Sequence, residues 1–417
     1  MNMFRLAIRV LGLGAIGALT LTAPAAIPMV APGSSAQQIG LNNTSDIPVN
    51  LKNTPEDMVV KALLLIKQDR LDQAEAIIDE TLKLYPNFRL ANLIKGDLLM
   101  AHTEALPHMG AYQEASTEAI QNFEAEARVR LERHLEAPPK GMVPASLLEM
   151  SPQQKYALVV DTGHSRMYVF ENHNGTPQYV TDYYITIGKL GVGKQREGDQ
   201  RTPLGVYEVT GSLDLNKVGG FYGSGAFPLS YPNDWDKLQG KTGHGIWLHG
   251  VPADTYSRPP RASNGCVVLT NPDLQQLEPR LQFGVTPVII TKQIDWVTPP
   301  EREKLSEDLQ AAVNSWEKDW ESRDTSRYLS HYSPAFKAGD SDYQSWAAQK
   351  QAVNQGKSYI DVKLNNVSMF AYPGQPDMAE VTFEQDYKSN NLANRMMKRQ
   401  YWKRENGVWK IIYEGSA

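Results

Sequence analysis

A single cysteine, Cys266, and an upstream histidine, His249, are the residues of this sequence best suited to chemistry. A free cysteine thiol has a pKa of about 8.5 and is mostly protonated at neutral pH, so a cysteine nucleophile needs a neighbouring base. His249 ends the strand-like run Ile246–His249, and Cys266 begins the run Cys266–Leu269. If a loop brings these runs side by side, the imidazole can accept the thiol proton. The alternative is that Cys266 is a small buried hydrophobic residue and His249 a core histidine.

Ser263, Asn264 and Gly265 lead into the cysteine. A glycine at this position lets backbone N–H groups point outward, and those of Gly265 and Cys266 could form an oxyanion hole for a tetrahedral acyl intermediate. The Ser263 hydroxyl is expected to orient the turn by hydrogen bonds to nearby backbone groups. These residues together predict nucleophilic acyl chemistry at Cys266.

This segment resembles the catalytic motif of the L,D-transpeptidase (YkuD-type) domain, in which a His-Gly pair precedes a Ser-His-Gly-Cys turn. The block from Gly198 to Tyr207 is similar to the Gly-Asp-x-Arg-Thr-Pro-x-Gly-x-Tyr strand entrance of that family. The stretch from Tyr222 to Asn233 is similar to the branch that includes peptidoglycan L,D-carboxypeptidases shaping bacterial cells. That branch also carries a C-terminal domain like the one expected here. The three blocks lie in order within residues 155–292.

The resemblance implies that Cys266 is the nucleophile, His249 the general base and Gly265 the glycine of the oxyanion turn, with Ser263 and Asn264 in supporting roles. Asn264 stands where the family motif has a second histidine. An asparagine can donate an amide hydrogen bond but cannot shuttle protons.

A second departure is Val268, which stands where the family commonly has an arginine two places after the cysteine. The missing cation could bind a carboxylate of the substrate. Arg258 or Arg261, in the loop between the two motif segments, could replace it.

The substrates implied by the resemblance are peptidoglycan stem peptides, with no cofactor and no metal. Cys266 would attack the bond between the L-centre of a diaminoacid and D-Ala, leaving a thioester. An amine acceptor gives a 3-3 cross-link, the expected transpeptidase reaction, whereas water gives a trimmed tripeptide and makes the protein an L,D-carboxypeptidase. A non-catalytic wall-binding scaffold is the alternative of another class. The expected substrate contacts are Arg258, Arg261, Gly250, Tyr222 and Tyr231.

The composition excludes several other classes of protein. The 417 residues carry 42 basic and 47 acidic side chains, a formal charge of −5, so the basic footprint of a nucleic-acid-binding protein is missing. One cysteine cannot form an intrachain disulfide. With 41% hydrophobic and 21% charged residues, the chain is typical of globular proteins.

Residues 1–36 have the features of a secretory signal peptide, and residues 37–53 those of a flexible linker. Arg5 and Arg9 precede the apolar stretch Val10–Ala23, and Ser34-Ser35-Ala36 offers a cleavage site. An uncleaved anchor helix in the inner membrane is the alternative. Either way, the sequence predicts a periplasmic protein.

Residues 54–136 are predicted to form a helical region that resembles tetratricopeptide (TPR) repeats. Thr54-Pro55 is a strong helix start, and two helices are expected to be divided near Gln68–Arg70. Ala62, Ala74 and Pro86 match the small-small-Pro spacing of such a repeat. The region is expected to be a helical cap on the next domain or a surface for other cell-wall proteins.

Residues 155–292 are predicted to be mainly β, with one short helix after Asn271. The expected strands are Tyr156–Val160, Arg166–Phe170, Tyr179–Ile187, Gly205–Val209, Ile246–His249, Cys266–Leu269 and Val288–Thr291.

Residues 298–417 are predicted to be an α+β domain resembling the nuclear-transport-factor-2-like (NTF2-like) fold, a further possible surface for cell-wall partners. A long helix starts at Thr298, and short helical structure is expected from Tyr328 to Phe336. The strands are expected at Tyr359–Leu364, Val367–Tyr372, Ala379–Tyr387, Met396–Glu405 and Gly407–Glu414. The predicted fold class is therefore multidomain, with helical, mainly β and α+β parts in chain order.

Overall fold

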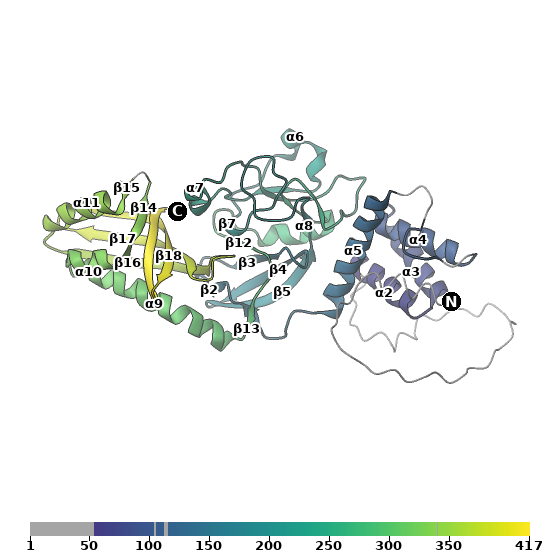
Figure 1. Ribbon diagram of the computed structural model, residues 1–417, viewed down its shortest axis with the longest axis horizontal. Coiled ribbons are helices and arrows are strands. Elements are labelled where there is room, and N and C mark those ends of the chain that lie inside the picture. The colour runs from purple at the N-terminus through teal and green to yellow at the C-terminus, as the bar shows by residue number, and fades with distance from the viewer. Residues whose placement is uncertain (1–53, 104–105, 112–115, 340) are drawn as a thin grey trace. The chain divides into compact units, whose positions relative to one another are not determined.

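The structure, a computed structural model, describes residues 54–103, 106–111, 116–339 and 341–417 (Figure 1). The predicted signal peptide and linker lie outside the described residues. Contacts divide the chain into two units, Met1–Leu135 and Glu136–Ala417. In the described part of the chain, no helix is both long and apolar enough to cross a membrane.

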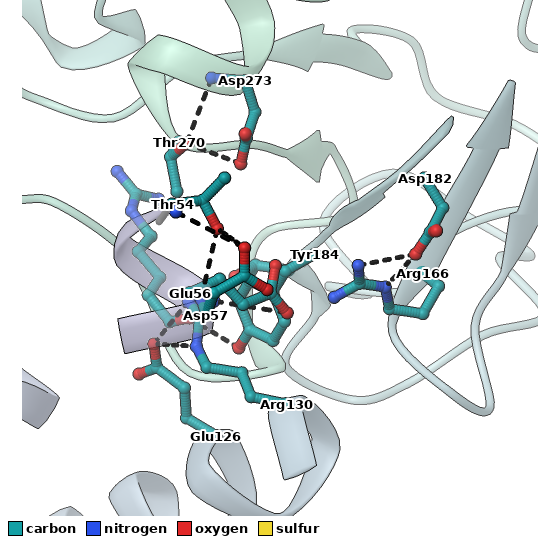
Figure 2. A network of polar contacts seen from close by, with 12 residues as sticks. Thr54, Glu56, Asp57, Glu126, Arg130, Arg166, Asp182, Tyr184, Thr270 and Asp273 are labelled. Atoms are coloured by element: carbon teal, nitrogen blue, oxygen red, sulfur yellow. Dashed lines mark hydrogen bonds and ion pairs between the residues drawn. The ribbon is translucent and has the colours of Figure 1, made fainter. Parts of the chain in front are cut away.

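The first unit contains helices α2 (Pro55–Lys67), α3 (Leu71–Leu84), α4 (Arg89–Ala101) and α5 (Thr117–Leu135). Thr54 caps α2 in a reciprocal capping box with Asp57, as its Thr-Pro sequence predicts. Ala62 and Ala74 are fully buried. On α5, Arg130 and Glu126 form a buried ion pair at 2.8 Å (Figure 2). The predicted helices are confirmed, whereas their classification as a TPR-like repeat stays a prediction.

The central domain is built on a five-stranded mixed sheet in the order β5–β4–β3–β12–β7. Its strands are β3 (Tyr156–Asp161), β4 (Arg166–His173), β5 (Thr176–Tyr184), β7 (Gly205–Glu208) and β12 (Pro287–Thr291). β12 runs parallel to β3 and antiparallel to β7. Arg166 and Asp182 join β4 to β5 through two hydrogen bonds of 2.6 and 2.8 Å (Figure 2). The predicted strand Tyr179–Ile187 ends earlier than expected, since Ile187 belongs to a separate short strand.

Two smaller sheets lie beside the first. One has the order β11–β9–β8, with β8 (Ala226–Pro228), β9 (Trp247–His249) and β11 (Val267–Val268); the other pairs β6 (Ile187–Gly188) with β10 (Arg261–Ser263). The core contains apolar side chains of the five-stranded sheet, such as Val160 and Ile290, and of the small one, such as Leu248 and Val267. The mainly β domain is therefore a layered structure whose core holds the strands of the two motif segments in place.

The helices of this domain are short: α6 (Leu215–Val218), η1 (Gly220–Tyr222), α7 (Asp234–Leu238), α8 (Asn271–Leu277) and η2 (Glu278–Arg280). α8 is the helix expected after Asn271. Its cap is Thr270, whose hydroxyl accepts from the N–H of Asp273 at 3.2 Å (Figure 2). This cap fixes the place where α8 begins, and with it the position of Asn271.

The C-terminal domain has a seven-stranded sheet in the order β15–β14–β19–β18–β17–β16–β2. Its elements are β2 (Leu147–Glu149), α9 (Pro299–Glu321), α10 (Thr325–Ser330), β14 (Tyr332–Ala338), β15 (Ser341–Asp342), α11 (Tyr343–Gln355), β16 (Ile360–Ala371), β17 (Met378–Ser389), β18 (Ala393–Glu405) and β19 (Val408–Ser416). Trp316 and Trp320 of α9 are buried in its core with Phe383 of β17.

Two predictions for this domain are wrong. Residues expected to be helical up to Phe336 instead form β14, which pairs in parallel with β19. The two strands expected at Tyr359–Leu364 and Val367–Tyr372 are one strand, β16, interrupted only by a register shift between Asn365 and Ser368. Helix α11 was not predicted.

Residues before the central domain also contribute to the C-terminal part of the fold. β2 pairs with β16, and β1 (Val143–Pro144) pairs with β13 (Trp296–Val297). A second core joins the two domains, with Val159 and Ile289 of the central sheet packed among residues such as Phe370 and Tyr401 of the C-terminal sheet. The two domains of this unit therefore share buried apolar surface, and the segment before the central domain adds two strand pairings.

Candidate active site

Strand pairing brings the two motif segments together. β9 and β11 run parallel, with Val268 opposite His249 and Val267 opposite Leu248. Cys266 immediately precedes β11, two residues before Val268, so it lies on the same face as His249 by strand alternation. The register thus places the thiol and the imidazole in neighbouring positions of one sheet face.

The imidazole of His249 has a defined orientation. Its Nδ1 lies 2.6 Å from the carbonyl oxygen of Gly250, and because a carbonyl only accepts, Nδ1 carries the proton. Nε2 is therefore the nitrogen with a lone pair. Burial, with a further contribution from the Arg258 charge, lowers the pKa of His249 to about 4, although the bond to Gly250 opposes this shift. At neutral pH His249 is thus a neutral base.

The thiol of Cys266 is also neutral. Burial raises its pKa above the ordinary value of a thiol, while the backbone N–H of Trp247 and the charges of Arg258 and Lys194 act in the opposite direction. Sγ donates to the carbonyl oxygen of Gly245 at 3.3 Å. The resting site therefore holds a thiol and an imidazole, and the thiol must lose its proton as it reacts.

Hydrogen bonds hold the turn before the cysteine. The Ser263 hydroxyl donates to the Cys266 carbonyl at 2.7 Å and accepts from the Gly265 N–H at 3.1 Å. Ser263 thus orients the turn as the sequence suggests. The bond from the Gly265 N–H to the Ser263 hydroxyl differs from the expected oxyanion hole, because this N–H already has a partner. The N–H of Cys266 is the remaining one of the two expected donors.

Thr202 supports this turn from outside. Its fully buried side chain donates to the Gly265 carbonyl at 2.9 Å and accepts from the Gly188 N–H at 2.9 Å. Gly265 has a φ of +126°. A Cβ there would lie 2.7 Å from the carbonyl oxygen of Arg201. Only glycine fits this combination of backbone angle and close approach.

Aromatic side chains and one arginine surround the imidazole. The ring of Tyr222 meets that of His249 edge-on at 5.1 Å and contacts Trp247 at 4.8 Å. Phe221, which is 54% exposed, lies 6.4 Å from His249, and the guanidinium of Arg258 lies over its ring at 4.6 Å. The wall around the base is largely aromatic, with the guanidinium of Arg258 at its rim.

The two arginines that could replace the missing motif cation differ in burial and in their effect on the site. Arg258 is half-buried, and its charge acts on both His249 and Cys266. Arg261 is exposed at the start of β10. Val268 itself is buried in β11. The geometry therefore favours Arg258 as the cation of the site.

Other expected contacts have different places. Tyr231 was expected to touch substrate, but it is buried in the core and its hydroxyl donates to the Thr242 carbonyl at 3.1 Å. Gly250 is buried too, with its N–H donating to the Tyr222 carbonyl at 3.0 Å, so its polar groups serve the protein rather than a substrate. Asn264 is exposed within the turn between Ser263 and Cys266.

The sequence reasoning missed the residues that stabilise the loop around Thr202. Lys194, almost fully buried, forms a 2.9 Å ion pair with Asp199. Asp199 also accepts from the backbone N–H groups of Gln195 and Arg196, and although burial opposes them, these bonds hold its pKa at about 2. The Gly-Asp-x-Arg-Thr-Pro block contains Asp199 and Thr202 and was the available signal. Among the described residues, no group of His, Cys, Asp or Glu could hold a metal ion.

Comparison with known proteins agrees with this geometry. Residues 155–290 match the L,D-transpeptidase catalytic domain (YkuD), and residues 308–415 match the Cds6 C-terminal NTF2-like domain. The structure of Bd1075 from Bdellovibrio bacteriovorus is 32% identical, and the match covers 66% of this chain and 98% of Bd1075 with a TM-score of 0.59. The chain belongs to the L,D-transpeptidase (YkuD) family. Its C-terminal domain is NTF2-like, as the sequence predicts.

A second similar structure is that of the helical cell shape determining protein Pgp2 from Campylobacter jejuni. It is 27% identical, with 65% of this chain and 95% of Pgp2 covered and a TM-score of 0.57. The structure of a point mutant of Pgp2 matches with 28% identity and the same TM-score. No curated protein sequence matches the chain. The family assignment makes the chain an enzyme of the L,D-transpeptidase and L,D-carboxypeptidase type, which acts on peptidoglycan peptides.

Proposed function

We propose that Cys266 forms a thioester with peptidoglycan stem peptides and that His249 is its general base. The observation that carries this proposal is the hydrogen bond between Nδ1 of His249 and the Gly250 carbonyl, from which the protonation of the ring follows. Nδ1 donates to this carbonyl, so the lone pair of the ring is on Nε2. His249 lies in β9, which pairs with the strand that directly follows Cys266. A cysteine activated by a neighbouring base is the usual requirement for this chemistry.

The reaction begins when the Sγ of Cys266 attacks the carbonyl carbon of the bond between the L-centre and D-Ala. The thiol proton passes to Nε2 of His249, and the carbonyl oxygen becomes an oxyanion near the Cys266 N–H. Collapse of the intermediate breaks the C–N bond, and the imidazolium returns its proton to the leaving D-Ala amine. An acyl thioester on Cys266 and free D-Ala result.

Arg258 is the proposed partner of the D-Ala carboxylate. Its guanidinium is half-buried over Phe221 at the rim of the site, and burial weakens the competition from water for a bound anion. A requirement for a free carboxylate would select stem peptides that end in D-Ala.

We assign water as the acceptor of the thioester, which makes the protein an L,D-carboxypeptidase that trims tetrapeptide to tripeptide for cell-shape control. The similarity to the cell shape determining protein Pgp2, which covers 65% of this chain and 95% of Pgp2, supports this choice. The transpeptidase reaction, which the sequence analysis favoured, uses the same thioester and differs only in the acceptor. A periplasmic location, reached by the predicted signal peptide, gives the enzyme access to its substrate.

The test is digestion of purified disaccharide tetrapeptide by the mature chain, followed by mass spectrometry of the products. Free D-Ala with disaccharide tripeptide is the expected result. Dimeric muropeptide among the products would show that the acceptor is an amine rather than water. Neither product, with binding to isolated cell walls retained, would overturn the catalytic proposal in favour of a scaffold.

A further inference from the structure

The side chain of Asn271 occupies the space between two segments of the site. Its Oδ1 accepts from the backbone N–H of Ser224 at 3.0 Å and of Val251 at 3.1 Å, and its Nδ2 donates to the Val251 carbonyl at 2.8 Å. Ser224 follows the aromatic segment that ends at Tyr222, and Val251 follows His249 by two residues. One amide therefore ties the base segment to the aromatic wall.

Two glycines make room for this amide. A Cβ at Gly250 would lie 2.2 Å from Oδ1 of Asn271, and a Cβ at Gly223 would lie 2.1 Å from the same atom. Both distances are shorter than any real contact, so only glycine is compatible with the amide at each position. The capped start of α8 holds Asn271 in place from the other side.

The peptide unit between Gly250 and Val251 links Asn271 to the imidazole. Its N–H is held by Oδ1 of Asn271, and its carbonyl oxygen accepts the Nδ1 proton of His249 at 2.6 Å. A peptide unit is planar, so fixing its N–H also fixes its C=O. Hydrogen bonds in such a chain also polarise one another, which makes the carbonyl a better acceptor.

We propose that Asn271 is a positioning residue for the reaction, which holds the Gly250–Val251 peptide plane so that His249 keeps its Nδ1 proton and presents Nε2 to Cys266. This inference rests on the proposed role of His249 as the base. Asn271 does not touch the reacting atoms; it acts on the base through one peptide group. The arrangement corresponds to a third group that orients the base of a nucleophile–base pair.

The variant Asn271→Ala tests this proposal. We expect its kcat to fall about 100-fold with little change in KM, because a misplaced base affects the chemical step more than binding. In protein carrying ¹⁵N-labelled histidine, the imidazole shifts of His249, assigned with His249→Gln, should move from the Nδ1–H tautomer towards Nε2–H. This NMR readout does not depend on turnover, so it separates failure of this inference from failure of the proposed function.

Asn172 provides a matched control. Its half-buried amide also makes three backbone bonds, to the carbonyls of Ser151 and Gln154 and from the N–H of Gly175, but on the five-stranded sheet. Asn172→Ala should lower the melting temperature without changing the His249 tautomer or the kcat of the folded fraction. An Asn271→Ala protein with wild-type kcat and an intact Nδ1–H tautomer would overturn the proposal, as would equal effects of the two variants.

The variant Asn271→Asp covers the case in which the alanine variant does not fold. Its carboxylate still accepts from Ser224 and Val251 but can no longer donate to the Val251 carbonyl, so the kcat should fall less than in the alanine variant. The added negative charge near the imidazole should move the acid limb of the pH–rate profile to higher pH. A folded aspartate variant with an unshifted acid limb would contradict the link between this side chain and the base.

Discussion

The hydroxyl of Thr202 donates to the carbonyl oxygen of Gly265 at 2.9 Å, one residue before the nucleophile. Thr202 belongs to the Gly198–Tyr207 block, which is distant in sequence from Cys266. The hydroxyl also accepts from the N–H of Gly188, so it is fully engaged. The conformation of the nucleophile turn therefore depends on a buried side chain from another part of the domain.

Replacing Thr202 with valine removes this bond while keeping the shape of the side chain. We expect the free energy of unfolding to fall by about 1–3 kcal/mol, because a buried carbonyl and a buried N–H lose their partner. The kcat/KM should fall at least about tenfold as the turn loosens. Thr202→Ser keeps the hydroxyl and should retain most of the activity; equal activity in both variants would contradict the role of the bond. Urea unfolding and D-Ala release measure these effects.

The pKa values of His249 and Cys266 predict a broad pH profile. His249 must be neutral to accept a proton, and its pKa lies at about 4, below the ordinary 6.5. The kcat/KM for tetrapeptide should therefore increase as the pH rises through about 4 and then stay level through neutral pH. This ratio reports the ionisation of groups in the free enzyme. Alkylation of Cys266 by iodoacetamide should be slow at pH 7 and accelerate above pH 9. An acid limb near pH 6.5 would show that the imidazole is solvated.

Arg258 should affect both binding and ionisation. In Arg258→Gln, the KM for tetrapeptide should rise at least about tenfold, because the D-Ala carboxylate loses its cation. The acid limb should move to higher pH, since the arginine charge disfavours protonation of His249. Arg261→Gln, at the exposed start of β10, is the matched control and should change neither quantity. Equal effects in the two variants would indicate a general loss of positive charge rather than a specific contact.

Glu380 predicts how stability depends on pH. This buried carboxyl of β17 faces Arg399 at 3.4 Å, and Arg399 also pairs with Glu208 of the central domain at 2.9 Å. Burial, with a smaller contribution from the Glu208 charge, raises the pKa of Glu380 from 4.5 to about 7, despite the opposing charge of Arg399. The folded chain thus holds a proton that the unfolded chain loses.

The resulting stability is fully present below pH 4.5 and is lost as the pH rises to about 7. The loss should be at most about 3 kcal/mol, since each pKa unit corresponds to about 1.4 kcal/mol. Glu380→Gln, which cannot ionise, should flatten this dependence in urea unfolding at pH 5 and pH 8. Glu384→Gln on the same strand is the control. A pH dependence that survives in Glu380→Gln would assign it to other groups.

Much of the site could be predicted from local sequence. Short apolar runs predicted β9 and β11, and the motif residues predicted the Ser263 turn, which the structure contains. The catalytic roles of Cys266 and His249 stay predictions. The wrong expectations concern long-range placement. Tyr231, which lies in the Tyr222–Asn233 block, was expected to contact substrate, but its hydroxyl donates to a backbone carbonyl inside the core.

Other features depend on partners that the local sequence does not indicate. β2 could not be foreseen, because its three residues become a strand only by pairing with β16, far along the chain. Asn271 was read only as the start of a helix. Its contacts lie with Ser224 and Val251, which reach it through the tertiary fold.

The most direct test of the account is detection of the thioester on Cys266. The mature chain is mixed with tetrapeptide, quenched in acid within milliseconds to seconds, and examined by intact mass spectrometry and peptide mapping. We predict an acyl adduct on the peptide that contains Cys266, lighter than the full substrate by one D-Ala, and neither adduct nor D-Ala release in Cys266→Ala. Undiminished D-Ala release by Cys266→Ala would contradict the central claim.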